Sequence, residues 1–181
     1  MKKALLIIAV IAVLSGCGTT ETLTCTTSNT VGNFTSNSTY MIEYQGNDVK
    51  MLTVTYDYRD DHVDGVGTGT DGTTDDDETD TDDDGIVDGV VGEALDDVVS
   101  GITNGILDIA GIRSRHNARF GTYTNTEGFT TNIDTDNDTD YKVTYTYDLN
   151  KLSDTDIATF GISRNLDTLR SGYTNRGMTC K

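Results

Sequence analysis

A strict two-residue alternation of apolar and polar side chains is the pattern that most constrains the fold of this chain. Two segments, residues 52–58 and 141–147, place tyrosine, valine or leucine at every second position, with threonine, Asp57 or Lys142 between them. Successive side chains of a strand point to opposite faces, so each segment has one buried and one solvated face. One-sided burial of this kind is typical of antiparallel sheets. The alternation therefore predicts an antiparallel sheet.

Turn and capping residues extend this prediction to a small α+β fold. Residues 39–44 alternate in the same way, and Gln45-Gly46-Asn47-Asp48 between them and residues 52–58 is typical of a tight hairpin. Short strands are also expected at 22–26 and 178–180. Ser153 with Asp156 forms a helix-start motif, and Asn165 can cap a second helix that Gly177 ends. We expect a small antiparallel sheet with two or three packed helices.

A strongly acidic region interrupts this pattern. From Asp60 to Ile112 the chain has 17 acidic residues and neither lysine nor arginine. Apolar residues are rare up to Gly85, so this part cannot bury enough surface to offset its ordering entropy unless an ion neutralises it. Residues 90–112 then carry apolar side chains at three- and four-residue steps, which indicates a helix packed against the sheet. We interpret residues 59–118 as an acidic, partly disordered and partly helical insertion in a single α+β domain spanning 23–181.

The N-terminal segment indicates export from the cytoplasm. Lys2-Lys3, an apolar run from Ala4 to Leu14 and small residues before Cys17 form a secretory signal that is too short to span a membrane permanently. Leu14-Ser15-Gly16-Cys17 resembles the bacterial lipobox. That resemblance implies residues 1–16 as a signal peptide, cleavage before Cys17, a diacylglycerol on the Cys17 thiol, and residues 17–22 as a lipidated tether. The alternative is an ordinary cleaved signal in which the cysteine occurs by chance.

The charge of the chain limits its partners. The formal net charge is −17, and removal of the signal would take away two lysines. Nucleic-acid binding is excluded as an expected function, because Lys and Arg must replace the counterions of the phosphates. The charge also opposes adsorption to anionic lipid, so the acyl chains on Cys17 would hold the protein to the membrane. We expect a location in the bacterial cell envelope, on the extracytoplasmic side of the membrane.

Two cysteines remain besides Cys17. An exported compartment permits disulfides, and the two remaining cysteines, Cys25 and Cys180, are expected to pair with each other. Such a bridge would close nearly the whole domain and, in the loop-entropy model, would stabilise it by restricting the unfolded chain. The alternatives are two buried free thiols, or a redox or metal role, for which the chain has no CxxC spacing.

The acidic region contains a candidate calcium loop. Residues 80–88 follow the pattern D-x-D-x-D-G-x-x-D. Calcium takes six to eight oxygen ligands, and Gly85 allows the sharp turn that brings them together. The pattern resembles the loops of EF-hand, dockerin and thrombospondin type 3 repeats, although Val91 stands where an EF-hand has a bidentate glutamate. A solvated acidic linker is the other interpretation. The candidate ligands are the carboxylates of Asp80, Asp82, Asp84 and Asp88 and the backbone carbonyl of Ile86.

The order of short motifs along the chain resembles the YehR-like small bacterial lipoproteins. Besides the lipobox, these motifs are Leu23-Thr24-Cys25-Thr26, the hairpin 39–58, residues 145–149 followed by Lys151-Leu152-Ser153, and Gly177-Met178-Thr179-Cys180. The similarity covers residues 17–58 and 119–181. It implies a lipid-anchored α+β domain and carries over no catalytic residue.

The expected function is a non-enzymatic binding or structural module. The chain has no HExxH, no GxSxG and no phosphate-binding glycine loop followed by lysine. His116 lies in the basic segment 113–119 and is expected at a solvated helix end, and a small hydrolase that uses His116 is one alternative. A solute-binding accessory of a transporter is another. Its pocket would be lined by Tyr40, Tyr44, Tyr145 and Tyr147.

Overall fold

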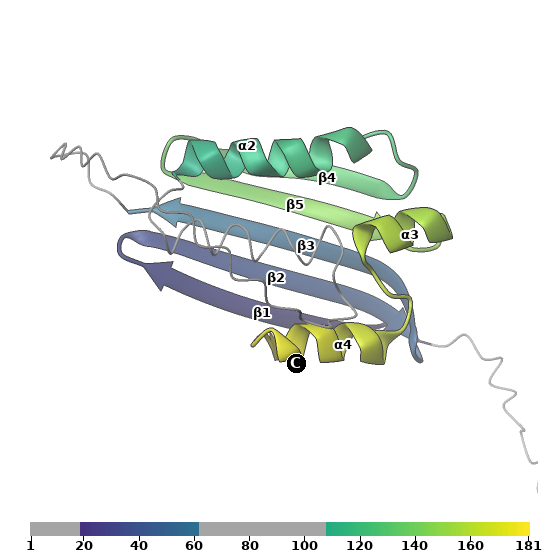
Figure 1. The fold of residues 1–181 in the computed structure, drawn as a ribbon. Coiled ribbons are helices and arrows are strands. Elements are labelled where there is room, and N and C mark those ends of the chain that lie inside the picture. Colours follow the sequence, from purple (N-terminus) through teal and green to yellow (C-terminus); the bar gives the residue numbers. More distant parts are fainter. Residues whose placement is uncertain (1–18, 62–107) are drawn as a thin grey trace, which may run out of the picture.

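The computed structural model describes residues 19–61 and 108–181, which form one layer of strands and one layer of helices (Figure 1). The six strands pair antiparallel throughout in the order β4-β5-β3-β2-β1-β6. The predicted α+β fold with an antiparallel sheet is confirmed. The strands are β1 (Glu21–Val31), β2 (Phe34–Gln45), β3 (Asp48–Asp60), β4 (Phe129–Asp136), β5 (Asp140–Asp148) and β6 (Thr179–Cys180); the helices are α2 (Ile109–Phe120), the short 3₁₀ helix η1 (Gly121–Tyr123), α3 (Asp154–Phe160) and α4 (Leu166–Asn175).

The core lies between the sheet and these helices. Leu52, Val54, Tyr56 and Tyr58 of β3 are buried, whereas the threonines between them are partly exposed. The same alternation holds along β5, from Tyr141 to Tyr147. α2, α3 and α4 supply the opposite wall of the core with buried isoleucine, leucine and aromatic side chains. The one-sided burial expected from the sequence is therefore present.

Helix boundaries in the C-terminal half follow the predicted caps. The Ser153 hydroxyl accepts a hydrogen bond from the Asp156 backbone N–H at 3.1 Å, and Asp156 bonds back to the Ser153 N–H at the start of α3. The Asn165 side chain accepts from the Thr168 N–H at 3.0 Å and begins α4. Gly177, with φ of 79°, follows α4 and redirects the chain towards β6.

The first hairpin is longer than the sequence predicts. β1 and β2 continue through the polar stretch 27–38 and meet at a two-residue turn, Gly32-Asn33, where Gly32 has φ of 60°. Ser36 and Ser38 take core-facing positions and are buried. Because serine stands where an apolar residue would mark a strand, the alternation is hidden in the sequence.

Two elements between residues 108 and 136 also differ from expectation. The helix expected over 90–112 lies mostly outside the described residues, but α2 runs on through the basic segment to Phe120. The strand β4 is not marked by alternation, because it is a sheet edge whose side chains are mostly exposed, with Ile133 48% exposed. β4 ends at Asp136, and residues 137–139 form the turn that leads into β5.

The signal peptide, the start of the tether at Cys17 and most of the acidic insertion lie outside the described residues. Within residues 19–61 and 108–181, no helix is long and apolar enough to cross a membrane.

Candidate functional site

A disulfide between Cys25 and Cys180 joins the first and last strands of the domain. The two residues are direct partners in the β1–β6 pair, with an S–S distance of 2.00 Å and a sequence separation of 155. Thr24 and Lys181 exchange backbone hydrogen bonds of 3.0 and 2.9 Å beside the bridge. The predicted pairing is confirmed.

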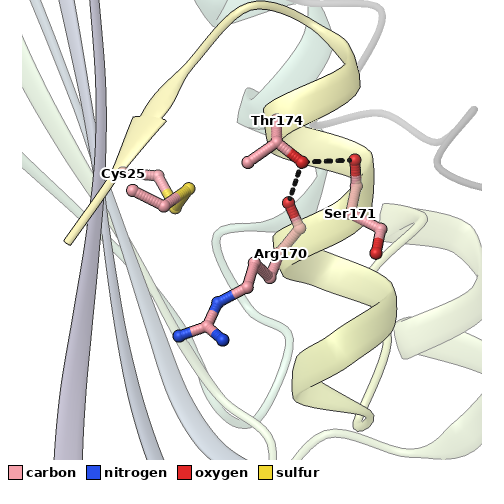
Figure 2. The surroundings of a disulfide bond; sticks show 5 residues. Cys25, Arg170, Ser171 and Thr174 are labelled. Carbon is pink, nitrogen blue, oxygen red and sulfur yellow. Dashed lines mark hydrogen bonds between the residues drawn. A yellow bond between two sulfur atoms is a disulfide. The ribbon is translucent and has the colours of Figure 1, made fainter.

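Helix α4 covers this bridge from the core side. Figure 2 shows the two sulfurs in the space between β1 and α4, facing the turn of the helix that carries Arg170, Ser171 and Thr174. Thr174 donates its hydroxyl hydrogen to the carbonyl oxygens of Arg170 and Ser171, at 2.9 and 3.1 Å. Cys25 is 0% exposed. The surroundings therefore suit a structural crosslink, since an accessible thiolate is what a reactive cysteine requires.

His116 is the second notable side chain, and the structure corrects its expected place. It is 3% exposed on the buried face of α2, not at a solvated helix end. The reason is helical spacing, because Ile112, His116 and Phe120 recur at four-residue steps and share the face that packs on the sheet. The neighbouring arginines therefore lie off this buried stripe. Arg113 forms an ion pair with Asp136 of β4, with Nε and Oδ1 2.5 Å apart.

Two tyrosines from the sheet hold the His116 ring. The Nε2 atom lies 3.0 Å from the Tyr58 hydroxyl oxygen, and Nδ1 lies 2.9 Å from the Tyr145 hydroxyl oxygen. A neutral imidazole carries one N–H donor and one acceptor nitrogen. One tyrosine therefore accepts a hydrogen bond from the ring, and the other donates one to it. All three polar groups are satisfied without solvent.

The electrostatics of this cluster keep it uncharged. Burial lowers the pKa of His116 to about 3, and the positive charge of Arg119 adds to the effect. Burial also raises the pKa of both Tyr58 and Tyr145, and neighbouring tyrosines add to this. At neutral pH the three groups are therefore neutral hydrogen-bonding partners in the core.

The tyrosines expected around a solute pocket are mostly core residues. Tyr40, Tyr145 and Tyr147 are buried, and the Tyr40 hydroxyl lies 3.1 Å from the hydroxyl of Tyr56. Tyr44 lies at the end of β2 and donates a hydrogen bond to Glu21 at 3.1 Å. The three buried tyrosines belong to one hydrophobic core between the sheet and the helices, where Tyr56 lies between Tyr40 and Tyr145.

A shallow hollow lies elsewhere, beside β1 and the start of β6. Its volume is about 510 Å³. Its lining is hydroxyl-, amide- and backbone-rich and carries no charged side chain: Thr26, Thr27, Ser28, Asn37, Ser38, Thr39, Gly177 and Thr179. Sequence reasoning missed it, because it depends on where the two-residue strand β6 begins beside β1.

The remaining predicted site residues lie outside the described part of the chain. These are the lipidation candidate, Cys17, and the calcium candidates at 80–88. Within residues 19–61 and 108–181 there is no cluster of three or more His, Cys, Asp or Glu side chains arranged to hold a metal.

Comparisons with known proteins do not assign a family. No protein-family model matches the chain, and a search of curated proteins returned no match. Among solved structures, the chain is similar to the NMR structure of a protein from Streptococcus pneumoniae TIGR4, with 13% identity and a TM-score of 0.45 over 100% of this chain and 94% of that one.

Proposed function

We propose that this protein is a bacterial envelope lipoprotein, anchored by lipid on Cys17, whose extracytoplasmic α+β domain serves as a non-enzymatic binding or structural module. The observation that carries the proposal is the position of Cys17. It ends a lipobox-like sequence and stands four positions before β1, the first strand of the disulfide-closed domain. The short tether leaves no room for another folded unit between lipid and sheet.

The disulfide supports an extracytoplasmic location. Disulfides persist in exported compartments and are rare in the reducing cytosol. The bridge joins the two ends of the described domain, near the point where the chain would leave the membrane. It thus suits a domain held by one terminus, because the strand that carries the tether is crosslinked to the sheet's last strand.

The tether length gives the proposed orientation. Four residues reach about 14 Å when fully extended. The end of the sheet that would face the membrane carries Glu21 at the start of β1, the β2–β3 turn and the start of α4. The Asn47 side chain of that turn bonds to the carboxylate of Asp167 in α4 at 3.2 Å. Asp48 lies there too, in an ion pair with Lys50, and the acyl chains would supply the attachment to the membrane.

The His116 cluster supports a non-enzymatic role for the described domain. A general base must reach the proton that it abstracts, directly or through one water. Both nitrogens of His116 instead face tyrosine hydroxyls inside the core. The buried position of Tyr40, Tyr145 and Tyr147 likewise favours packing over a solute pocket, which makes the transporter-accessory alternative the weaker one.

Fractionation of cells that express the chain tests the proposed anchoring. The wild-type protein is expected in the membrane fraction, released by detergent but not by high salt, because acyl chains and not charges hold it. Cys17→Ser is expected in the soluble extracytoplasmic fraction. Recovery of Cys17→Ser and wild type in the same fraction would contradict the proposal.

We further propose that the acidic loop 80–88 holds calcium, with Asp80, Asp82, Asp84, Asp88 and the Ile86 carbonyl as ligands. Extracellular calcium modules bind at about 10⁻⁴–10⁻³ M, so titration calorimetry should reach about 5 mM calcium. We expect binding heat from the wild type and none from Asp82→Asn with Asp84→Asn. Asp138→Asn, which removes an acidic side chain of the β4–β5 turn, is the matched control. An unchanged heat in the double variant would refute this loop as the site.

A further inference from the structure

One border of the sheet is only partly covered. β6 pairs with β1 at Cys25 and Thr26, and its first residue, Thr179, lies opposite Thr26. In the described part of the chain, no strand pairs with β1 between Thr27 and Val31 on that side. Figure 1 shows this half of β1 extending towards its arrowhead, beyond the C-terminal end of the chain.

The backbone direction along β1 shows which groups face this border. Thr24 exchanges both of its hydrogen bonds with Lys181, so its N–H and C=O point to the β6 side. The direction alternates along a strand, so Ser28 and Thr30 point their N–H and C=O the same way. Both residues are exposed. Their backbone N–H and C=O groups therefore lie at the part of the border that β6 does not cover.

The two borders of the sheet differ in how they are protected. Natural sheets blunt their edges with charges, prolines or bulges that prevent pairing with another chain. The opposite border strand, β4, has an irregularity between Ile133 and Thr135, and Asp134 and Asp136 lie beside it. Residues 27–31 of β1 are Thr-Ser-Asn-Thr-Val, with no charge, no proline and no break in register with β2. This border has the character of a pairing surface.

A polar hollow lies next to this border. The hollow of about 510 Å³ is lined by residues 26–28 of β1, residues 37–39 of β2, Gly177 and Thr179. A side chain added at Gly177 would meet no atom within 4 Å. The hollow thus extends from the start of β6 across β1 onto β2, and its hydroxyl and amide lining suits polar side chains next to this border.

From these observations we propose that the Thr27–Val31 edge of β1 accepts an extended, positively charged segment of another protein as an added antiparallel strand. Main-chain hydrogen bonds to Ser28 and Thr30 hold the segment, as in other cases of strand addition. The net charge of −17 selects a cationic partner and repels a second copy of this chain. The uncharged edge itself places no like charge opposite the incoming strand.

Amide NMR spectra of the ¹⁵N-labelled full chain test this inference. The probe is a synthetic peptide of alternating threonine and valine with lysine at both ends. A second peptide has glutamate in place of lysine, and a third carries methyl groups on the backbone nitrogens that would face β1. We expect the lysine peptide to shift the Ser28 and Thr30 amide signals and slow their hydrogen exchange. The glutamate and methylated peptides should bind about tenfold more weakly.

Two variants of Ser28 distinguish the contribution of its backbone N–H to peptide binding from that of its side chain. Ser28→Pro removes an N–H that points away from β2, a change that edge strands tolerate, and we expect it to weaken binding of the lysine peptide about tenfold. Ser28→Ala keeps the N–H and should bind as the wild type does. Shifts that map to other residues, or equal binding of the methylated peptide, would overturn the proposal. Signals at Ser28 and Thr30 that change with protein concentration alone would instead assign the edge to a second copy and also overturn it.

Discussion

Removal of the Cys25–Cys180 disulfide should strongly destabilise the domain. The bridge closes a loop with a sequence separation of 155. In the loop-entropy model, a loop of that length gives about 5 kcal/mol of stabilisation, because the crosslink restricts the unfolded chain. At about 2–4 °C per kcal/mol for a domain of this size, the melting temperature should fall by about 10–20 °C.

The structure adds a local consequence to this global one. β6 has only two residues. Next to it, the backbones of Thr24 and Lys181 exchange two hydrogen bonds. So short a strand cannot hold its register without the bridge, since hydrogen bonds contribute only about 0.5–1.5 kcal/mol each. We expect the amide protons of Thr24 and Lys181 to exchange much faster in the variant, while those of β2 and β3 stay protected.

The assay is urea unfolding of the Cys25→Ala/Cys180→Ala variant beside the wild type, with and without reductant. The wild type with reductant is the matched control, because reduction opens the bridge without changing the sequence. The denaturant slope m should also rise in the double variant, since an unfolded chain without the crosslink exposes more surface. A loss below about 1 kcal/mol with an unchanged slope would refute the argument that the bridge acts on the unfolded chain.

Three further predictions concern the core and its turns. His116→Leu should lower the free energy of unfolding by about 2–5 kcal/mol in chemical denaturation, because it leaves the buried hydroxyls of Tyr58 and Tyr145 without their partner; a change below 1 kcal/mol would show that the cluster contributes little. The pKa of His116 is about 3 in the folded protein and 6.5 otherwise, so the unfolded state binds the extra proton as pH falls. The stability due to neutral His116 is thus complete above pH 6.5 and is lost towards pH 3, with a slope of about 1.4 kcal/mol per pH unit; unfolding of wild type and His116→Leu from pH 7 to pH 3.5 should show this difference in slope, and parallel curves would contradict it. Gly128→Ala should destabilise by about 3 kcal/mol or more, because Gly128 has φ of 88° and a new Cβ would lie 2.9 Å from the Asp148 carbonyl oxygen. Gly46→Ala, with φ of 65° and open space around it, should lose only about 1–2 kcal/mol; equal losses in thermal melts would show that the close approach at Gly128 is unimportant.

The sheet could be predicted where burial is one-sided and apolar. Residues 52–58 and 141–147 lie in β3 and β5 as expected, because each core-facing position carries a tyrosine, valine or leucine. Prediction failed where the core accepts polar atoms. Ser36 and Ser38 face the core in β2, and His116 faces it in α2, so a polar residue at a buried position concealed the periodicity of each element.

The candidate site could likewise be predicted only in part. Pairing of Cys25 with Cys180 followed from counting cysteines in an exported chain, and the register of β1 with β6 explains it physically. The Tyr58–His116–Tyr145 cluster could not be predicted, because it needs three elements to meet across 87 positions of sequence. Four-residue spacing of Ile112, His116 and Phe120 was the available signal. It predicts that His116 is buried, but not which hydroxyls form hydrogen bonds with its ring.

Intact-mass and N-terminal peptide analysis of the protein purified from bacterial membranes tests the central proposal most directly. We predict a mature chain that begins at Cys17, with the mass of a diacylglycerol on that residue and a disulfide between Cys25 and Cys180. Cys17→Ser should yield no lipid-bearing species. A mature chain that begins at another residue, or that begins at Cys17 with a free thiol, would contradict the account.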